Sequence, residues 1–176
     1  MDELKKKQCE ARVVSKVGQP PSACSCGRCI NMCKTPCMPT PYEVEALIDA
    51  GYQNRIAPSI WAFGMLAGFI DRPIPTLMPA QVNGWCTFFQ DGKCELHDTG
   101  LKPLEGRLAH HAHPDSREKC VAWEIAKEWI SDDNFDCIAS IFKKIMDYDM
   151  KGQFNPVIPD NAEEIKNRNY ENIRRT

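Results

Sequence analysis

Half of the cysteines in this chain are crowded into one short segment. Five of the ten lie within fourteen residues, at positions Cys24, Cys26, Cys29, Cys33 and Cys37. A looser pair, Cys86 and Cys94, follows about fifty residues later. Cysteine thiolates are common ligands of zinc and of iron–sulfur clusters, so this density indicates a metal. We expect one metal centre that takes its ligands from both groups.

The start of the chain favours a cytoplasmic location in which these thiols stay reduced. Residues 1–8 are polar and charged, whereas a signal peptide needs an apolar core, and no apolar stretch approaches the ~20 residues of a membrane span. Glutathione and thioredoxin keep cytoplasmic thiols reduced. We therefore interpret the clustered cysteines as ligands or redox groups and not as five disulfides.

Length and charge limit the fold and the partners. A chain of 176 residues fits one domain and buries about 68–70 % of the surface of its unfolded form, so it does not need a metal merely to fold. Its 22 basic and 24 acidic residues are intermixed and give a formal charge of -2. Because nucleic-acid binding needs a basic face or tail, we expect no nucleic-acid partner.

The pattern along the chain predicts a mainly α fold with a small β-hairpin and irregular cysteine-rich metal-binding loops, in a single domain. We expect an N-terminal arm at 1–23 and a polar C-terminal arm at 151–176. Between them, residues 24–150 are predicted to form a cysteine-cluster metal-binding domain that ends in a pair of helices.

One helix is marked by both of its ends. Thr40 is predicted as the N-cap, Pro41 takes the first helical position, and Glu43 completes a capping box. Gly51 ends the helix. The apolar stripe along the helix predicts that it packs on the core.

Other segments give weaker patterns. Residues 56–70 are apolar all round and predict a buried element, either a helix or strand and turn. The prolines in 73–79 predict an extended connection.

Asp115 and Glu118 form a second capping box, and apolar stripes predict two antiparallel helices between 115 and 148, with a break at 131–134. Cys9 is expected to be an incidental thiol.

Residues 85–96 predict a hairpin that turns at Asp91-Gly92. In a regular hairpin of this length, Cys86 and Cys94 would lie ~13 Å apart along the ladder. Two thiolates that bind one zinc must each lie within ~2.3 Å of the ion. Both can therefore bind one ion only if the hairpin is bulged or curled.

The spacing of the cysteines leaves the metal open. Only Cys26 and Cys29 form a pair of the zinc-ribbon kind, whereas Cys29, Cys33 and Cys37 recur every four residues, as on one face of a helix. Structural zinc usually takes two such pairs, and iron–sulfur clusters often take three cysteines from one compact run. The metal is therefore expected to be zinc or iron, a [4Fe-4S] cluster included.

These stretches resemble the bacterial YkgJ-like cysteine-cluster proteins, a family described as a zinc- or iron-chelating domain. The matching parts are residues 26–37, the helix cap at 40–43, residues 86–94 and the segment 102–107. The resemblance covers about residues 24–108 and implies metal binding. Where the family has its last cysteine, this chain has Gly106, which implies an open position, a replacement by Cys24 or a histidine, or a site rearranged within the first cluster.

The predicted ligands follow from the cysteine groups and from this resemblance. The main set is Cys26, Cys29, Cys33, Cys37, Cys86 and Cys94. Further candidates are Cys24 and the histidines near the second group and near the vacated position, namely His97, His110 and His113. A neutral imidazole can replace a thiolate as the fourth ligand of zinc.

Three functions remain open. The first is a non-catalytic metal-binding protein, in which the metal closes loops over the core or is carried as cargo. The second is an iron–sulfur redox or methyl-transfer-related enzyme with an open coordination position, since the cluster also resembles part of the flagellin lysine N-methylases. The third is a zinc-stabilised module that binds a protein partner. The chain has no dinucleotide fingerprint, P-loop, zincin motif or nucleophile elbow.

Overall fold

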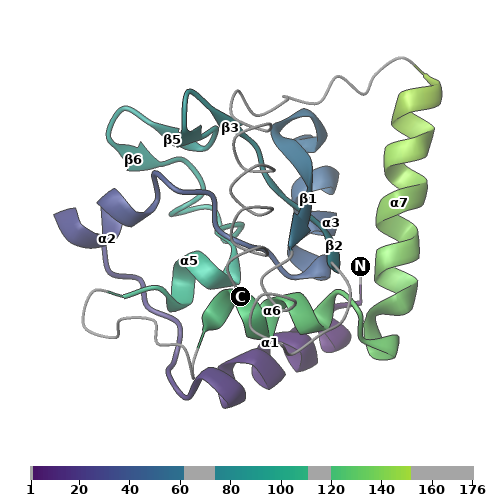
Figure 1. Ribbon diagram of the computed structural model, residues 1–176, viewed down its shortest axis with the longest axis horizontal. Coiled ribbons are helices and arrows are strands. Elements are labelled where there is room, and N and C mark those ends of the chain that lie inside the picture. The colour runs from purple at the N-terminus through teal and green to yellow at the C-terminus, as the bar shows by residue number, and fades with distance from the viewer. Residues whose placement is uncertain (1, 62–73, 111–119, 152–176) are drawn as a thin grey trace, which may run out of the picture.

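The computed structural model describes residues 2–61, 74–110 and 120–151 (Figure 1). Helices make up about half of them. The α-helices are α1 (Glu3–Val17), α2 (Gly27–Met32), α3 (Pro41–Asp49), α5 (Leu104–Leu108), α6 (Val121–Glu128) and α7 (Phe135–Met150), and the 3-10 turns are η1 (Gln53–Arg55) and η2 (Asp132–Asn134). None of the described helices is long and apolar enough to span a membrane.

The strands form small antiparallel sheets of two strands each. They are β1 (Ile56–Trp61), β2 (Ile74–Pro79), β3 (Gln81–Val82), β4 (Trp85–Cys86), β5 (Phe89–Gln90) and β6 (Lys93–Cys94). β1 pairs with β2, β3 with β4, and β5 with β6. A mainly helical domain with small hairpins, as expected from the sequence, is therefore confirmed at this level. The proposed capping box at 115–118, residues 62–70 and the arm from 152 onward lie outside the described residues.

The N-terminal helix contributes to the core of the domain. α1 packs against α6, and its residues Cys9, Val13 and Val17 are buried in the main hydrophobic cluster. The helix begins at Asp2, whose carboxylate accepts hydrogen bonds from the first turn, and ends at Gly18 with a φ of 76°. The polar sequence hides this role because only one face of the helix is apolar. Cys9 is therefore a core residue, where a thiol behaves as a small hydrophobe.

The predicted helix cap at Thr40 is confirmed. Thr40 accepts a hydrogen bond from the N–H of Glu43, and the Glu43 carboxylate accepts one from the N–H of Thr40 at 2.8 Å. Pro41 opens α3 and Gly51, with a φ of 88°, follows its end. The helix packs against α7 and β2.

Cys86 and Cys94 belong to two different hairpins. β3 and β4 turn at Asn83-Gly84, and β5 and β6 turn at Asp91-Gly92. All four turn residues have positive φ, as a type I′ turn requires. The predicted turn at Asp91-Gly92 is confirmed, but the hairpin is shorter than 85–96, and the Asn-Gly signal of the other hairpin was missed. Because the chain changes partner between β4 and β5, the two cysteines are not separated along one regular ladder.

The last two described helices do not form the expected antiparallel pair. α6 packs on α1 and α5, whereas α7 packs on α3 and runs along the side of the domain (Figure 1). The 3-10 turn η2 lies between them and redirects the chain. Trp129, just after α6, is buried and donates from Nε1 to the carbonyl of Pro39 at 2.9 Å.

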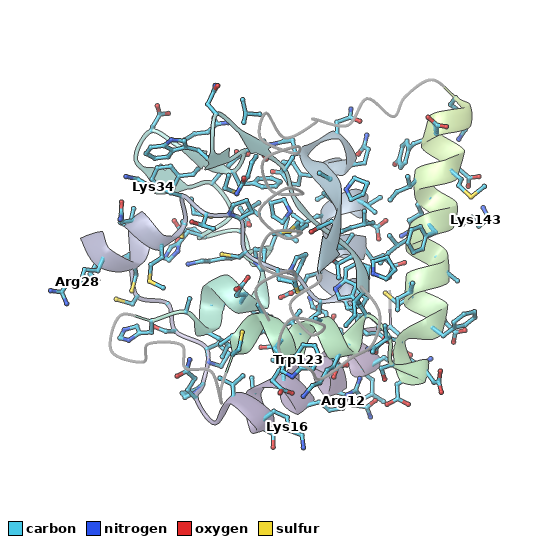
Figure 2. All side chains as sticks on the ribbon, in the orientation of Figure 1. Arg12, Lys16, Arg28, Lys34, Trp123 and Lys143 are labelled. Carbon is cyan, nitrogen blue, oxygen red and sulfur yellow. The ribbon has the colours of Figure 1, made fainter. Side chains whose placement is uncertain are left out.

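A partly buried ion pair joins α1 to α6. Arg12 on α1 (labelled in Figure 2) donates from Nη2 to Glu128 at 2.6 Å, and Asn134 donates to the same carboxylate at 2.8 Å. Glu128 exposes 7 % of its surface. Burial raises the pKa of Glu128, but the hydrogen bonds from Arg12 and Asn134 outweigh it, and the pKa lies below its usual value.

This ion pair is expected to stabilise the fold at neutral pH and to lose its effect in acid. Because the pKa of Glu128 is lower in the folded than in the unfolded chain, the unfolded chain takes up its proton first as the pH falls. The stabilisation is therefore complete above about pH 5 and is lost as the pH falls through the folded pKa. Urea unfolding in the presence of a chelator should give wild type a higher free energy of unfolding than Glu128→Gln at pH 7. This difference should shrink at pH 3. A difference that does not change with pH would contradict this.

Candidate metal centre

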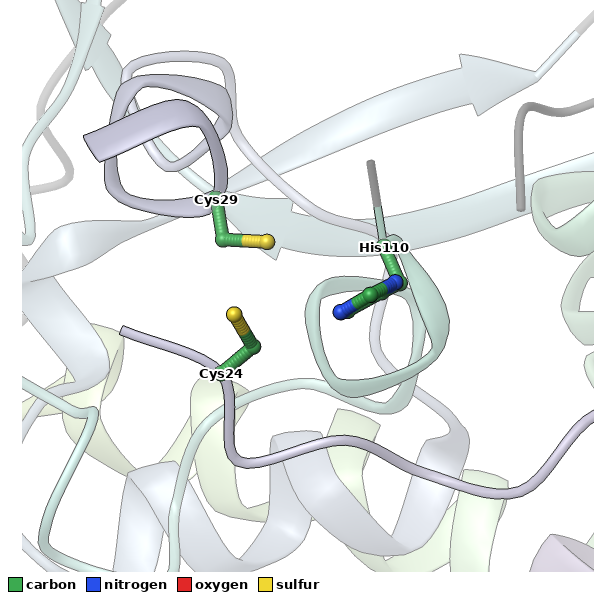
Figure 3. A group of neighbouring side chains, drawn as sticks. All are labelled: Cys24, Cys29 and His110. Carbon is green, nitrogen blue, oxygen red and sulfur yellow. The ribbon is translucent and has the colours of Figure 1, made fainter. Parts of the chain in front are cut away.

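Two cysteines and one histidine point toward a common space at the edge of the domain (Figure 3). The donor atoms of Cys24, Cys29 and His110 all lie within 4.8 Å of one another. Cys29 is buried on α2, and the other two side chains are half-buried. Among the described residues, this is the one group of three such side chains found this close together.

The spacing of these donors fits a tetrahedral metal ion. Zinc binds sulfur at about 2.3 Å and nitrogen at about 2.0–2.1 Å, so donors at tetrahedral angles are about 3.4–3.8 Å apart. The donor atoms of Cys24, Cys29 and His110 lie no more than 4.8 Å apart, so a small movement of the side chains would allow all three to bind one ion. Thiolate and imidazole are also ligands that zinc accepts together. The group can hold a metal ion.

Hydrogen bonds from the segment after α1 bring Cys24 beside His110. The side chain of Gln19 donates to the carbonyl of Leu108 at 2.8 Å, and the N–H of Ser22 donates to the carbonyl of Arg107 at 2.7 Å. These bonds attach the segment before Cys24 to α5, and His110 follows α5 directly. Cys24 and His110, 86 positions apart in the sequence, therefore meet at this place.

Cys26 lies beside the same group. It is the residue before α2 and is exposed. Its sulfur lies next to the backbone N–H groups of Cys29 and Arg28 and next to the thiols of Cys24 and Cys29, and the N–H of Cys29 is the largest of the effects that lower its pKa. A lowered pKa favours the thiolate, which is the form that binds metals. We call Cys24, Cys26, Cys29 and His110 the N-terminal site.

Four other cysteines form a second group, which we call the sulfur cluster. Its members are Cys33, Cys37, Cys86 and Cys94. Cys33 at the end of α2 and Cys94 in β6 lie near enough to shift each other's pKa, and α2 contacts β6. The Cys33 thiol donates a long hydrogen bond, 3.6 Å, to the carbonyl of Cys29. Cys37 lies close enough to Cys33 and Cys86 for their charges to raise its pKa, which burial raises most. The N–H of Cys86 donates to the carbonyl of Lys34 at 2.7 Å, and the Lys34 ammonium lies over the ring of Trp85 (Figure 2).

Lys102 provides a buried positive charge beside the sulfur cluster. It exposes 7 % of its surface, lies near enough to Cys33 for its charge to lower the pKa of that thiol, and places Nζ 3.5 Å from Nδ1 of His97. The nearby thiol of Cys94 and the charge of Lys102 lower the pKa of Cys33, although burial opposes them. The pKa of Cys94 is raised, first by the nearby Cys33 and then by burial. Cys33 is therefore the thiolate of the pair.

Gly106 leaves room for the sulfur cluster. A Cβ atom at this position would lie 2.9 Å from Sγ of Cys37 and 3.2 Å from Cε of Lys102. The atoms nearest to position 106 therefore belong to Cys37 and Lys102, and not to Cys24 or His110. The position that the resemblance leaves without a cysteine lies at the sulfur cluster and not at the N-terminal site.

Of the predicted ligands, Cys24, Cys29 and His110 come within 4.8 Å of one another, and the single centre expected from the sequence stays a prediction. Cys29 alone lies within α2, because the helix ends at Met32, and the expected helical face of three cysteines does not form. His97 lies beside Lys102, and His113 is outside the described residues. The role of Lys102 was missed, since no pattern around it distinguishes it from a surface lysine.

The chain as a whole was also compared with known proteins. No family model, no curated protein and no solved structure matches it. The resemblance to the YkgJ-like proteins therefore depends on the motifs within residues 24–108 alone.

Proposed function

We propose that this chain is a non-catalytic zinc-binding protein that holds the ion in the N-terminal site. The observation that supports this most is the closeness of Cys24, Cys29 and His110, whose donor atoms lie within 4.8 Å of one another although they come from distant parts of the sequence. Cys26, beside the thiols of Cys24 and Cys29, supplies the fourth ligand.

The ligand types favour zinc and a structural role. Three thiolates and one imidazole are a common set for structural zinc, which takes four protein ligands in a tetrahedron. Such a site leaves no position for a substrate. Its effect is to fasten the segment of Cys24 and the helix α2 to the chain after α5, and the free energy of binding adds to that of folding.

Metal analysis of the full chain tests this proposal. We expect protein purified without oxygen to be colourless and to contain zinc, and Cys24→Ser to lose one zinc per chain. A matched control is Cys120→Ser, because Cys120 is half-buried at the N-cap of α6, where serine is well tolerated. The control is expected to keep the zinc content of wild type.

Two results would contradict the proposal. A brown protein that contains iron and inorganic sulfide would replace zinc by an iron–sulfur centre and would favour redox or methyl-transfer chemistry. Equal zinc content in wild type, Cys24→Ser and His110→Ala would show that the N-terminal site does not bind the ion.

A further inference from the structure

We propose that the outer face of α7 is a self-association surface, on which a second copy of this chain docks its own α7 in antiparallel orientation. The surface, which we call the outer stripe, consists of Phe135, Ala139, Phe142 and Met146. The inference goes beyond the proposed function, because α2, which carries Cys29, lies on the side of the domain opposite α7 (Figure 1).

α7 has two apolar faces, and the fold covers one of them. The inner face buries Cys137 and Ile141 in the main hydrophobic cluster, and the helix packs there against α3. On the outer face, Phe135 and Met146 expose 68 % and 63 % of their surface, and Phe142 exposes 43 %. Helices that are apolar on more than one side are usually buried on more than one side, and an exposed apolar patch marks an interaction site.

The spacing of the outer stripe is that of a seam between two helices. Its members follow one another at intervals of four, three and four residues, so they lie in one line along the helix. A helix that packs on a globular core shows a wider apolar face, whereas a narrow line is typical of two paired helices. α7 has 16 residues and is about 24 Å long, so the partner that fits is another helix of similar length.

The sizes of the side chains favour a second copy of α7 as this partner. A two-fold axis between Ala139 and Ser140 brings residues at equal distances from the axis to the same level on opposite copies. Phe142 of one copy then lies level with the gap between Phe135 and Ala139 of the other, where the small alanine leaves room for the ring. Phe135 lies in turn between Phe142 and Met146 of the other copy, and contact between sulfur and an aromatic ring is favourable.

Charges beside the stripe fit the same arrangement. Asp136 and Lys143 are about two helical turns apart on one flank of α7, at equal distances from the proposed axis. The axis keeps this flank of both copies on one side, so Asp136 of each copy faces Lys143 of the other. Within one chain, Asp136 is paired with Lys5 at 3.2 Å and Lys143 with Asp147 at 2.8 Å. Association joins these pairs into rows of alternating charge, a match that a uniformly basic or acidic partner lacks.

Sedimentation of the full chain tests the inference. Zinc-loaded protein is measured over a range of micromolar concentrations under reducing conditions, which exclude disulfides between chains. We expect wild type to shift from the mass of one chain, 20.0 kDa, to twice that mass as its concentration rises. Cys24→Ser should show the same shift, because the dimer does not depend on the N-terminal site.

Phe142→Glu is expected to weaken self-association by at least about 30-fold, as loss of a central interface side chain does. Phe142 is exposed in the single chain, so the fold should tolerate glutamate, and an unchanged circular dichroism spectrum checks this. The matched control is Val82→Glu, which changes an exposed apolar residue of β3 outside the stripe and should associate like wild type.

Reversal of charges tests the orientation of the two helices. Asp136→Lys and Lys143→Asp each place like charges opposite each other, and each should weaken self-association about 5-fold or more. Combined in one chain, the two substitutions restore opposite charges across the axis. The double variant should therefore associate nearly as well as wild type.

Each part of the inference has a result that would overturn it. Wild type that stays a monomer at the highest concentration would mean that the stripe does not bind a second copy. A dimer that persists in Phe142→Glu, or that Val82→Glu disrupts equally, would place the interface outside the stripe. A double charge variant that associates no better than either single variant would reject the antiparallel arrangement. None of these results would change the zinc content expected of the N-terminal site.

Discussion

Cys29→Ser is expected to lower the free energy of unfolding of the zinc-loaded protein by about 2.5–4 kcal/mol and to remove one zinc ion. Structural zinc contributes about 10–16 kcal/mol in small zinc-binding peptides, which is about 2.5–4 kcal/mol for each of four ligands. Cys29 is the most buried ligand of the N-terminal site, and it exposes 5 % of its surface. A serine hydroxyl stays protonated at neutral pH and is a poor ligand for zinc.

Urea unfolding in zinc and in chelator measures this effect and separates metal binding from packing. In zinc, wild type should be more stable than Cys29→Ser by the stated amount. In chelator the difference should fall to about 1 kcal/mol, which is the part due to the buried thiol itself. If the difference is the same with and without zinc, Cys29 stabilises the fold only by packing, and its role as a ligand is wrong.

Glu43→Ala is expected to destabilise the fold by about 3–5 kcal/mol, as does breaking a buried ion pair from one side. Glu43 exposes 6 % of its surface. Its carboxylate accepts hydrogen bonds from the N–H of Thr40 at 2.8 Å, from the N–H of Leu104 at 3.1 Å and from Nη2 of Arg107 at 2.8 Å. Alanine leaves the two buried N–H groups without this acceptor, whereas Arg107 keeps its hydrogen bonds to Glu10.

A surface ion pair supplies the control for this substitution. Asp147 pairs with Lys143 at 2.8 Å on an exposed face of α7, and Asp147→Ala is expected to leave the free energy of unfolding nearly unchanged. Because Glu43 holds both ends of α5, we also expect Glu43→Ala to weaken zinc binding at His110, which follows that helix. A loss of stability below about 1 kcal/mol would mean that the Glu43 carboxylate is not needed to join α3 to α5.

Features encoded by neighbouring residues could be predicted from the sequence. The cap at Thr40 requires only a glutamate three residues later, and the turn at Asp91-Gly92 requires only two residues that accept positive φ. Asn83-Gly84 carries the same signal, but a hairpin of two-residue strands has too little apolar alternation around it to be recognised.

The meeting of Cys24, Cys29 and His110 could not be predicted, because it depends on contacts between distant segments. Cys24 lies next to His110 only because Gln19 and Ser22 are hydrogen-bonded to α5. Spacing within residues 24–37 does not indicate that Cys29, rather than Cys33, lies beside His110. In the same way, the lengths of α6 and α7 do not determine that they pack on different partners.

The distance in sequence between Cys24 and His110 has a consequence for biosynthesis. The ribosome adds about 5–20 residues per second, so roughly 4–17 s pass between the synthesis of these two ligands. During this time the nascent chain displays Cys24, Cys26 and Cys29 without the histidine that completes the N-terminal site. The site can close only after α5 has been made, so a reducing environment and protection of these early thiols matter most while the protein is still being translated.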